Sequence, residues 1–255
     1  MSKLETLLKE TPKNAVILDS WLKQRLISNS LKQKYLQYGW LRSIGRGASY
    51  LKDNLPNWQG AVSAMQGAGE KIHVGGKTAL QLQGAGHFIS PELSKLYLYG
   101  DSGQKLPAWF LQYDWQMQIY YYQTNFLPAD LGIENFSQEN GIILKTSSPE
   151  RAILELLYLV PSNQGIEEAY YIIENLSTLR ANLLQELLES CNSIKVKRLF
   201  FCLSEKARHS WITLLNKEKI DFGSGNRHIV TGGYLDPAYN ITLPKNWKDD
   251  ETTLF

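Results

Sequence analysis

Residues 18–50 read LDSWLKQRLISNSLKQKYLQYGWLRSIGRGASY, which contains two short helical patterns followed by a glycine-containing hairpin. In each helical pattern large apolar side chains recur three or four residues apart, which places them on one face of a helix. These side chains are Leu18, Trp21, Leu22 and Leu26 in the first pattern, and Leu31, Tyr35 and Tyr38 in the second. The polar residues 28–30 separate the two helices and offer a cap for the second one, and Gly39 is suited to end it.

The residues after this helix pair predict a β-hairpin. Two β-prone runs at 40–44 and 48–51 flank the loop Gly45-Arg46-Gly47, and short strands around a glycine-bearing loop are a hairpin signal. A leading helix is expected at 2–10, followed by a short extended segment at 14–17. Leading helix, helix-turn-helix and hairpin follow one another in the order of a winged helix-turn-helix domain.

The polar face of the second helix carries hydroxyl, amide and ammonium groups, which are the groups that bind base edges and phosphates. We expect the start of this helix to face DNA, its polar face to line the major groove, and the wing to contact backbone or minor groove. The candidate DNA-binding residues are Ser28, Asn29 and Ser30 at the start, Lys32, Gln33, Lys34 and Gln37 on the helix, and Arg42 and Arg46 on the wing. The alternative is an ordinary helical subdomain whose polar face is only solvated.

The charge of the chain is unevenly distributed. Residues 1–52 contain ten Lys and Arg but three Asp and Glu, a net charge of +7, within a chain whose formal net charge is +2. The remainder therefore holds 17 basic and 22 acidic residues, a net charge of −5. A basic N-terminal region on a slightly acidic body is the charge pattern of a nucleic-acid-binding domain joined to a second domain.

The middle of the chain changes in composition near Ser90-Pro91, where we place a domain boundary that separates residues 1–92 from residues 93–255. Helices are expected at 58–65 and 77–83, within a glycine-rich stretch that extends to Gly86. Beyond the boundary, strands are expected at 96–99, 109–111, 119–122 and 141–144.

The last hundred residues are mostly helical in pattern. The first helix runs from 148 to 160, and its start fits either a capping box of Ser147 with Glu150 or a Ser148 cap followed by Pro149. Further helices are expected at 165–174, 179–191 and 211–215, residues 194–204 fit a strand or a helix, and residues 227–243 are expected to be extended. The fold class is therefore α+β, with an N-terminal winged helix-turn-helix domain followed by a larger mixed α+β domain.

No motif in the sequence predicts catalysis, a cofactor or a metal. Gly75-Gly76-Lys77-Thr78 is similar to the end of a P-loop, but Lys71 stands where that motif needs a glycine. The four histidines have no metal-ligand spacing, and Gly223-Ser224-Gly225 lacks the downstream pair of acids that a nucleotidyltransferase requires. The aromatic runs at 97–99 and 109–122 could stack on bases, but alternating aromatics in strands are more often core.

The sequence also predicts where the protein works. Two widely separated cysteines, Cys191 and Cys202, suit a reducing compartment. The N-terminal residues lack the apolar core of a signal peptide, and no apolar run reaches the length of a membrane span. We therefore expect a soluble cytoplasmic protein with no membrane partner.

Four groups of residues follow one another along the chain. They are Trp21-Leu22 with Tyr35, Gly39-Trp40-Leu41 and Gly45-Arg46-Gly47-Ala48; Val74-Gly75-Gly76-Lys77-Thr78-Ala79-Leu80 with Gly84; Ser147-Ser148-Pro149-Glu150-Arg151-Ala152; and Gly232-Gly233-Tyr234-Leu235-Asp236-Pro237 with Tyr239-Asn240-Ile241. In this order they resemble the AbiEi-like antitoxin family of type IV toxin–antitoxin (abortive infection) systems. One departure from the family pattern is Ser49, where an aromatic residue is expected sooner in the hairpin.

The resemblance implies a phage-defence antitoxin that is not an enzyme. Its N-terminal winged helix would bind double-stranded DNA at its own promoter and repress its operon. Its C-terminal domain would counteract a nucleotidyltransferase-like toxin, without a stable complex being required. The alternatives are a plain winged-helix regulator whose C-terminal domain senses a ligand or dimerises, and a nucleotide-modifying enzyme, which would require an acidic or metal-binding cluster.

Overall fold

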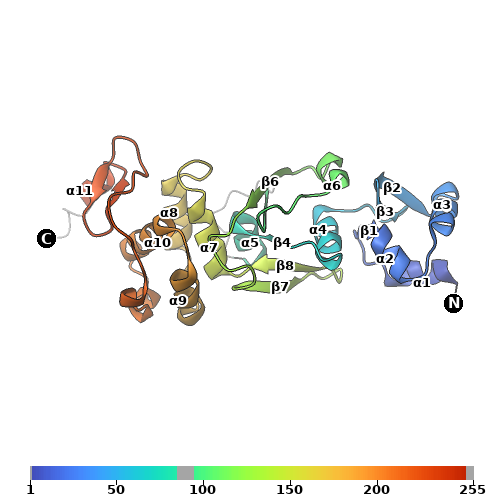
Figure 1. Ribbon diagram of the computed structural model, residues 1–255, viewed down its shortest axis with the longest axis horizontal. Coiled ribbons are helices and arrows are strands. Elements are labelled where there is room, and N and C mark those ends of the chain that lie inside the picture. The colour runs from blue at the N-terminus through green and yellow to red at the C-terminus, as the bar shows by residue number, and fades with distance from the viewer. Residues whose placement is uncertain (1, 85–94, 251–255) are drawn as a thin grey trace. The chain divides into compact units, whose positions relative to one another are not determined.

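The computed structural model describes residues 2–84 and 95–250, and contacts divide the chain into two compact units. Unit 1 comprises Met1–Val74, Glu92–Thr124 and Ile133–Thr146, and unit 2 comprises Gly75–Pro91, Asn125–Gly132 and Ser147–Phe255. The chain therefore passes between the units several times (Figure 1). Gly86 and Ser90-Pro91, the site of the expected domain boundary, lie outside the described residues.

The first part of unit 1 is a winged helix-turn-helix, as the sequence predicts. Its three strands form an antiparallel sheet in the order β1-β3-β2, so that the strand before the helix pair joins the hairpin that follows it. The elements are α1 (Lys3–Glu10), β1 (Ile17–Leu18), α2 (Asp19–Gln24), α3 (Asn29–Gln37), β2 (Leu41–Gly45) and β3 (Ala48–Leu51). Ser49, the departure from the family pattern, is buried in β3 and donates its hydroxyl hydrogen bond to the carbonyl of Ile17.

A small apolar core holds these elements together, and it corrects two sequence predictions. Leu26 was expected on the buried face but is 78% exposed, because α2 ends at Gln24 and the neighbouring Ile27 enters the core instead. Tyr38 was expected beside Tyr35 but is 72% exposed, since it follows the last residue of α3. The buried members of this core are Leu7, Ile17, Leu22, Ile27, Tyr35, Leu41 and Leu51.

The second part of unit 1 is a five-stranded mixed sheet in the order β6-β5-β4-β8-β7. The central strand β4 pairs antiparallel with β5 and parallel with β8, and β5 pairs parallel with β6 over six residues. The strands are β4 (Ile72–Val74), β5 (Lys95–Gly100), β6 (Gln118–Gln123), β7 (Ile133–Ser137) and β8 (Ile143–Ser147). The side-chain amide of Gln66, on helix α4 (Trp58–Gly67), bonds to the backbone of Ile72 and Lys145 and so fixes the helix to this sheet.

Two predictions in this part of the chain are corrected by the structure. Residues 109–111 were expected as a strand but form helix α6 (Ala108–Gln112), with Pro107 directly before it. Strand β7 was not predicted, because IENFS alternates only weakly between apolar and polar residues.

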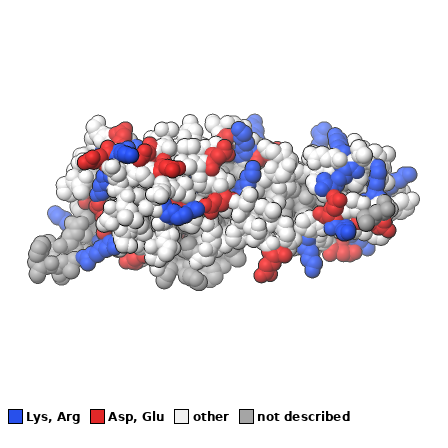
Figure 2. All heavy atoms as spheres, turned by 90° about the horizontal axis from the view of Figure 1, so that it is seen from below, with Lys and Arg blue, Asp and Glu red and all other residues white. Residues whose placement is uncertain are grey.

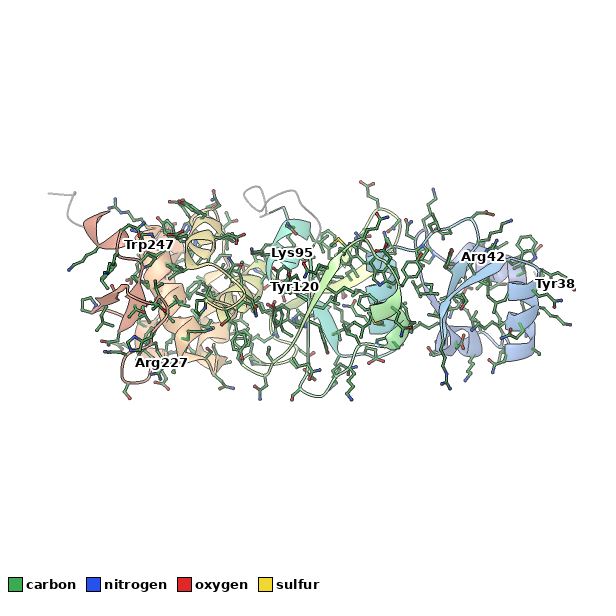
Figure 3. All side chains as sticks on the ribbon, turned by 90° about the horizontal axis from the view of Figure 1, so that it is seen from above. Tyr38, Arg42, Lys95, Tyr120, Arg227 and Trp247 are labelled. Carbon is green, nitrogen blue, oxygen red and sulfur yellow. The ribbon has the colours of Figure 1, made fainter. Side chains whose placement is uncertain are left out.

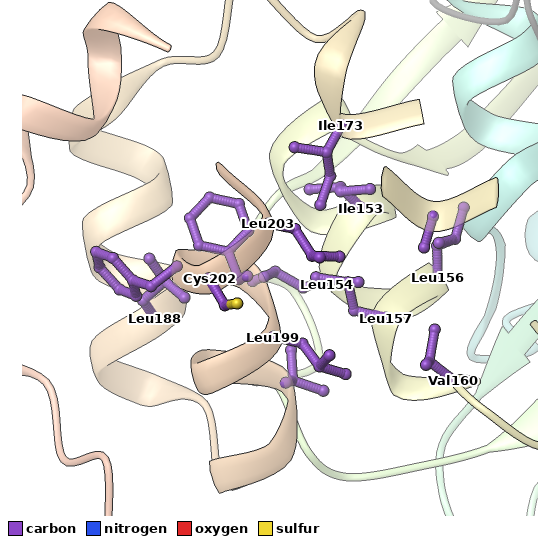
Figure 4. Close-up of a cluster of buried hydrophobic side chains, with 14 of the residues drawn as sticks. Ile153, Leu154, Leu156, Leu157, Val160, Ile173, Leu188, Leu199, Cys202 and Leu203 are labelled. Atoms are coloured by element: carbon purple, nitrogen blue, oxygen red, sulfur yellow. The ribbon is translucent and has the colours of Figure 1, made fainter. Parts of the chain in front are cut away.

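Unit 2 is a helical bundle built around α7. Helix α7 lies among its neighbours with most of its side chains buried, and Figure 4 shows Ile153 beside Ile173 and Leu157 toward Leu199, two side chains that come from other helices. The helices are α5 (Gly76–Leu82), α7 (Pro149–Tyr158), α8 (Ile166–Glu174), α9 (Ala181–Ser190), α10 (Ile194–Lys206) and α11 (Trp247–Asp250).

The open alternatives in the C-terminal part are resolved as follows. Residues 194–204, which fit a strand or a helix, belong to α10, and the expected helix at 211–215 is the 3-10 helix η1 (Ser210–Leu214). A second 3-10 turn, η2 (Lys217–Lys219), follows it. The expected extended region is largely loop, and its regular part is the antiparallel pair β9 (Tyr234–Asp236) and β10 (Ile241–Leu243).

Candidate nucleic-acid interface

Helix α3 is positioned by a cap at its start and by a buried anchor in its middle. The Ser28 hydroxyl accepts a hydrogen bond from the backbone N–H of Leu31 at 3.3 Å, which satisfies a donor that the first turn would otherwise leave free. The same hydroxyl lies 2.9 Å from that of Ser30. Tyr35 is buried in the winged-helix core, so the opposite side of α3 faces outward.

Most of the candidate residues on this helix are exposed together on that outward side. They are Ser28, Asn29, Ser30, Gln33, Lys34 and Gln37. Lys32 differs from them, because its side chain is only 12% exposed and its ammonium group pairs with the Asp19 carboxylate at 2.5 Å. The periodicity of the sequence located this face, but it gave no sign of the ion pair, whose partner lies on α2.

The wing presents the two remaining candidates. Arg46 lies exposed in the turn between β2 and β3, and Arg42 on β2 is paired with Tyr50. Arg42 is exposed (Figure 3). Gly47 has a φ of +88°, a conformation that favours glycine, and its carbonyl accepts the backbone N–H of Asp19 at 2.9 Å. Through this bond the wing turn is fixed to the start of α2.

Most charged side chains of the winged helix are basic, but some of these cations are held in ion pairs. Figure 2 shows Lys and Arg atoms in several groups on the visible face of this part, at the right, with acidic atoms among them. Two of the cations have fixed partners, since Arg25 pairs with Glu10 at 2.7 Å and Lys32 pairs with Asp19. Arg25 also lies 3.5 Å from the ring centroid of Trp21, a cation–π contact.

The exposure of two aromatic residues beside α3 was not predicted from the sequence. Tyr38 and Trp40 flank Gly39, and with Leu8 of α1 they line an open pocket of about 420 Å³. Gly39 in its left-handed conformation turns the chain after Tyr38, so that the helical spacing does not continue beyond α3.

The P-loop-like segment of unit 2 binds a side chain of the protein itself. Glu155 is buried, and its carboxylate accepts hydrogen bonds from the backbone N–H of Gly76 at 3.0 Å, the hydroxyl of Ser147 at 2.7 Å and Arg151 at 2.8 Å. Lys77 pairs with Glu168 at 2.5 Å. An internal carboxylate thus takes the place that a phosphate would need, and two sequence motifs far apart in the chain are joined through it.

The other candidate sites have structural roles where they are described. Arg198 donates hydrogen bonds to the carbonyls of Phe222 and Gly225, which ties the Gly223-Ser224-Gly225 loop to α10. Tyr97 and Tyr99 are buried in the sheet of unit 1. Within residues 2–84 and 95–250 no three His, Cys, Asp or Glu side chains are grouped to hold a metal ion. No helix in that part of the chain has the length and apolar character to cross a membrane.

The fold and the exposed basic face define the N-terminal part as a winged helix of the kind found in transcriptional regulators. The chain matches two family profiles: "Transcriptional regulator, AbiEi antitoxin N-terminal domain" over residues 1–91, and "Transcriptional regulator, AbiEi antitoxin, Type IV TA system" over residues 93–244. The chain belongs to the AbiEi antitoxin family of type IV toxin–antitoxin systems.

A solved structure with a similar fold is the crystal structure of the RV2827C protein from Mycobacterium tuberculosis. It superposes with a TM-score of 0.60 over 93% of this chain and 88% of that chain, at 13% sequence identity. At this identity the likeness concerns the fold. No curated protein sequence matches the chain.

Proposed function

We propose that this transcriptional regulator binds double-stranded operator DNA in its own promoter, through residues 1–92, and represses its operon. The observation that carries the proposal is the set of exposed hydroxyl, amide and cationic side chains on α3 and the wing. Such groups bind phosphates and base edges. The proposed contacts are Ser28, Asn29, Ser30, Gln33, Lys34 and Gln37 on α3, with Arg42 and Arg46 on the wing; Lys32 lies on the same helix but in an ion pair.

Residues 93–255 are assigned the antitoxin role, which is to counteract a nucleotidyltransferase-like toxin in the cytoplasm. Family membership supports a toxin partner. The proposed neutralisation does not depend on a stable complex with that toxin. The proposed role is abortive infection, a defence against phage in which the regulator itself catalyses no reaction. A plain transcriptional regulator would instead have no toxin to neutralise, so the gene beside its own distinguishes the two.

Replacing Arg46 by alanine should weaken binding to the promoter fragment and flatten its salt dependence. Each phosphate contact contributes about −0.9 to the slope of log affinity against log salt concentration, so loss of one contact reduces the slope by about that amount. Lys34→Ala should behave in the same way if Lys34 contacts a phosphate. Titrations of a labelled promoter fragment at several salt concentrations measure both quantities.

Lys9→Ala is the matched control, because Lys9 is an exposed cation of the same domain that lies on α1 and outside the proposed interface. It removes the same charge and should leave the slope nearly unchanged. Unchanged affinity and slope for Arg46→Ala would show that the wing does not contact DNA.

A further inference from the structure

Asp19 of α2 is bonded to both parts of the winged helix that would face DNA, the wing and α3. It is the first residue of α2, its backbone N–H donates to the wing carbonyl of Gly47 at 2.9 Å, and its carboxylate accepts from Lys32 of α3 at 2.5 Å. The backbone bond continues the β1–β3 pairing of Leu18 with Ala48 toward the wing turn. One residue of α2 therefore contacts both α3 and the wing turn.

The position of Asp19 is unfavourable for binding an anion. Residues 11–52 contain eight Lys and Arg and a single acidic residue, which is Asp19. A carboxylate near the phosphate backbone is repelled by it, and this repulsion weakens binding. The presence of an acid at this place therefore points to a role within the protein.

The state of Lys32 agrees with such a role. Its side chain is 12% exposed, whereas its neighbours Gln33 and Lys34 are exposed, and its charge is neutralised by a carboxylate that is itself 34% exposed. A partly buried ion pair between two helices restricts how they can rotate against each other. The direction of Lys32 along α3 is thus set by α2.

We infer that Asp19 is a positioning residue that fixes α3 relative to the wing, with Lys32 of α3 as its partner. Its contribution is to sequence discrimination, because base contacts in the major groove require the helix to keep one register while the wing grips the backbone. The inference rests on the proposed DNA-binding function.

The sign of the effect of Asp19→Asn on promoter binding tests the inference. If Asp19 acts only through its charge, its removal strengthens binding to every DNA. If it positions α3, its removal lowers the ratio of affinities for the promoter fragment and for a scrambled fragment of equal length. We expect a loss of about tenfold in that ratio, the size of one or two disturbed base contacts, with non-specific binding unchanged or stronger.

Three further full-length variants make the result decisive. Asp19→Glu keeps the charge but moves the carboxylate, so it should also lower the ratio. Asp19→Asn combined with Lys32→Gln should lower the ratio no further than Asp19→Asn alone, because both substitutions disturb one interaction. Asp53→Asn, which removes an exposed acid of the same domain, should leave the ratio unchanged.

The possible outcomes separate the two proposals. Failure of the unaltered protein to prefer its promoter would overturn the proposed function. A clear preference that survives both Asp19→Asn and Asp19→Glu in folded protein would overturn the inference alone. Circular dichroism and melting temperatures show whether each variant is folded, and Asp19→Glu supplies the answer if Asp19→Asn is not.

Discussion

Glu150 belongs to one of the sequence motifs, but its side chain is bound by a residue that lies far away in the sequence. It lies in the first turn of α7 and is 1% exposed. Its carboxylate accepts hydrogen bonds from the backbone N–H of Arg180 at 2.8 Å and from the guanidinium at 3.1 and 2.8 Å. The cap of α7 is Ser148, with Pro149 at the first helical position, so Glu150 is free to bind Arg180 instead of completing a capping box.

This arrangement predicts that the protein loses stability in acid. Burial raises the pKa of Glu150, but the hydrogen bonds from Arg180 and Ser148 lower it more, and the net result is a pKa below 4.5. The contribution of the charged form is therefore complete above pH 4.5 and is lost as the pH falls from there through the folded-state pKa. Urea unfolding at a series of pH values measures this loss.

Arg180→Met should remove this acid sensitivity and lower the free energy of unfolding at neutral pH by about 2 kcal/mol, because it removes the hydrogen bonds to the buried Glu150 carboxylate. The loss is no larger because half of the Arg180 side chain is exposed and solvent partly screens its bonds. Lys245→Met, at an exposed lysine of the same unit, is the control and should change neither quantity. Equal acid sensitivity with and without Arg180 would assign the loss to other carboxylates.

At the residue scale, only part of the candidate site could be predicted from the sequence. The polar face of α3 was readable because helical periodicity is local, and the exposed residues on it include Asn29, Gln33 and Lys34. The pairing of Lys32 with Asp19 was not readable, since it depends on how two helices pack. Domain boundaries and the individual DNA contacts stay predictions.

At the scale of elements, two glycines on α4 differ sharply in their surroundings. A Cβ atom at Gly60 would lie 1.9 Å from the carbonyl oxygen of Asn14, whereas a Cβ atom at Gly67 would have nothing within 4 Å. Gly60 therefore lets the helix approach the segment before β1, and Gly67 has no such task. The two positions form a matched pair within one helix.

Gly60→Ala should destabilise the protein by about 1–3 kcal/mol, as overpacking does, because backbone must move to admit the methyl group. Gly67→Ala should stabilise it slightly, by up to about 1 kcal/mol, since alanine loses less conformational freedom in a helix. Thermal unfolding of the two variants measures both. If the two substitutions had equal effects, the close approach at Gly60 would not be real.

The elements themselves were predicted in proportion to their length and regularity. Helices such as α7 and α9 have long apolar periodicity, and their positions were correct to within a few residues. The short run in α6 carries too few residues to separate a helix from a strand. The loop of residues 227–243 is rich in β-prone residues, but only β9 and β10 find strand partners there beyond an isolated bridge of Arg227 with Ile241.

At the scale of the whole molecule, the proposed division of labour is testable with the full chain. Arg46→Ala should weaken repression of a promoter fusion yet rescue growth from co-expressed toxin as well as the unaltered protein does, because toxin neutralisation is assigned to residues 93–255. The toxin to use is the nucleotidyltransferase-like product of the adjacent gene. Loss of rescue in Arg46→Ala, at equal protein level, would contradict separate roles.

The fragment 93–255 is the less suitable reagent for that experiment. It lacks β4, the central strand of the sheet in unit 1, and α5, whose Gly76 donates to the buried Glu155. A buried carboxylate that has lost one of its hydrogen-bond donors and an exposed strand edge both favour unfolding and aggregation. We expect the fragment to accumulate poorly, which immunoblotting of soluble extracts would show.

The position of β4 also bears on how the protein folds during synthesis. Its neighbour β5 follows it closely in the sequence, but its parallel partner β8 does not. Because Val74 of β4 pairs with Thr146 of β8, the sheet cannot be completed until the ribosome has passed Thr146. Synthesis at about 5–20 residues per second leaves the half-built sheet waiting for several seconds. The winged helix needs only residues up to Leu51 for its own sheet. It can therefore fold on the nascent chain while the strands after it are still being made.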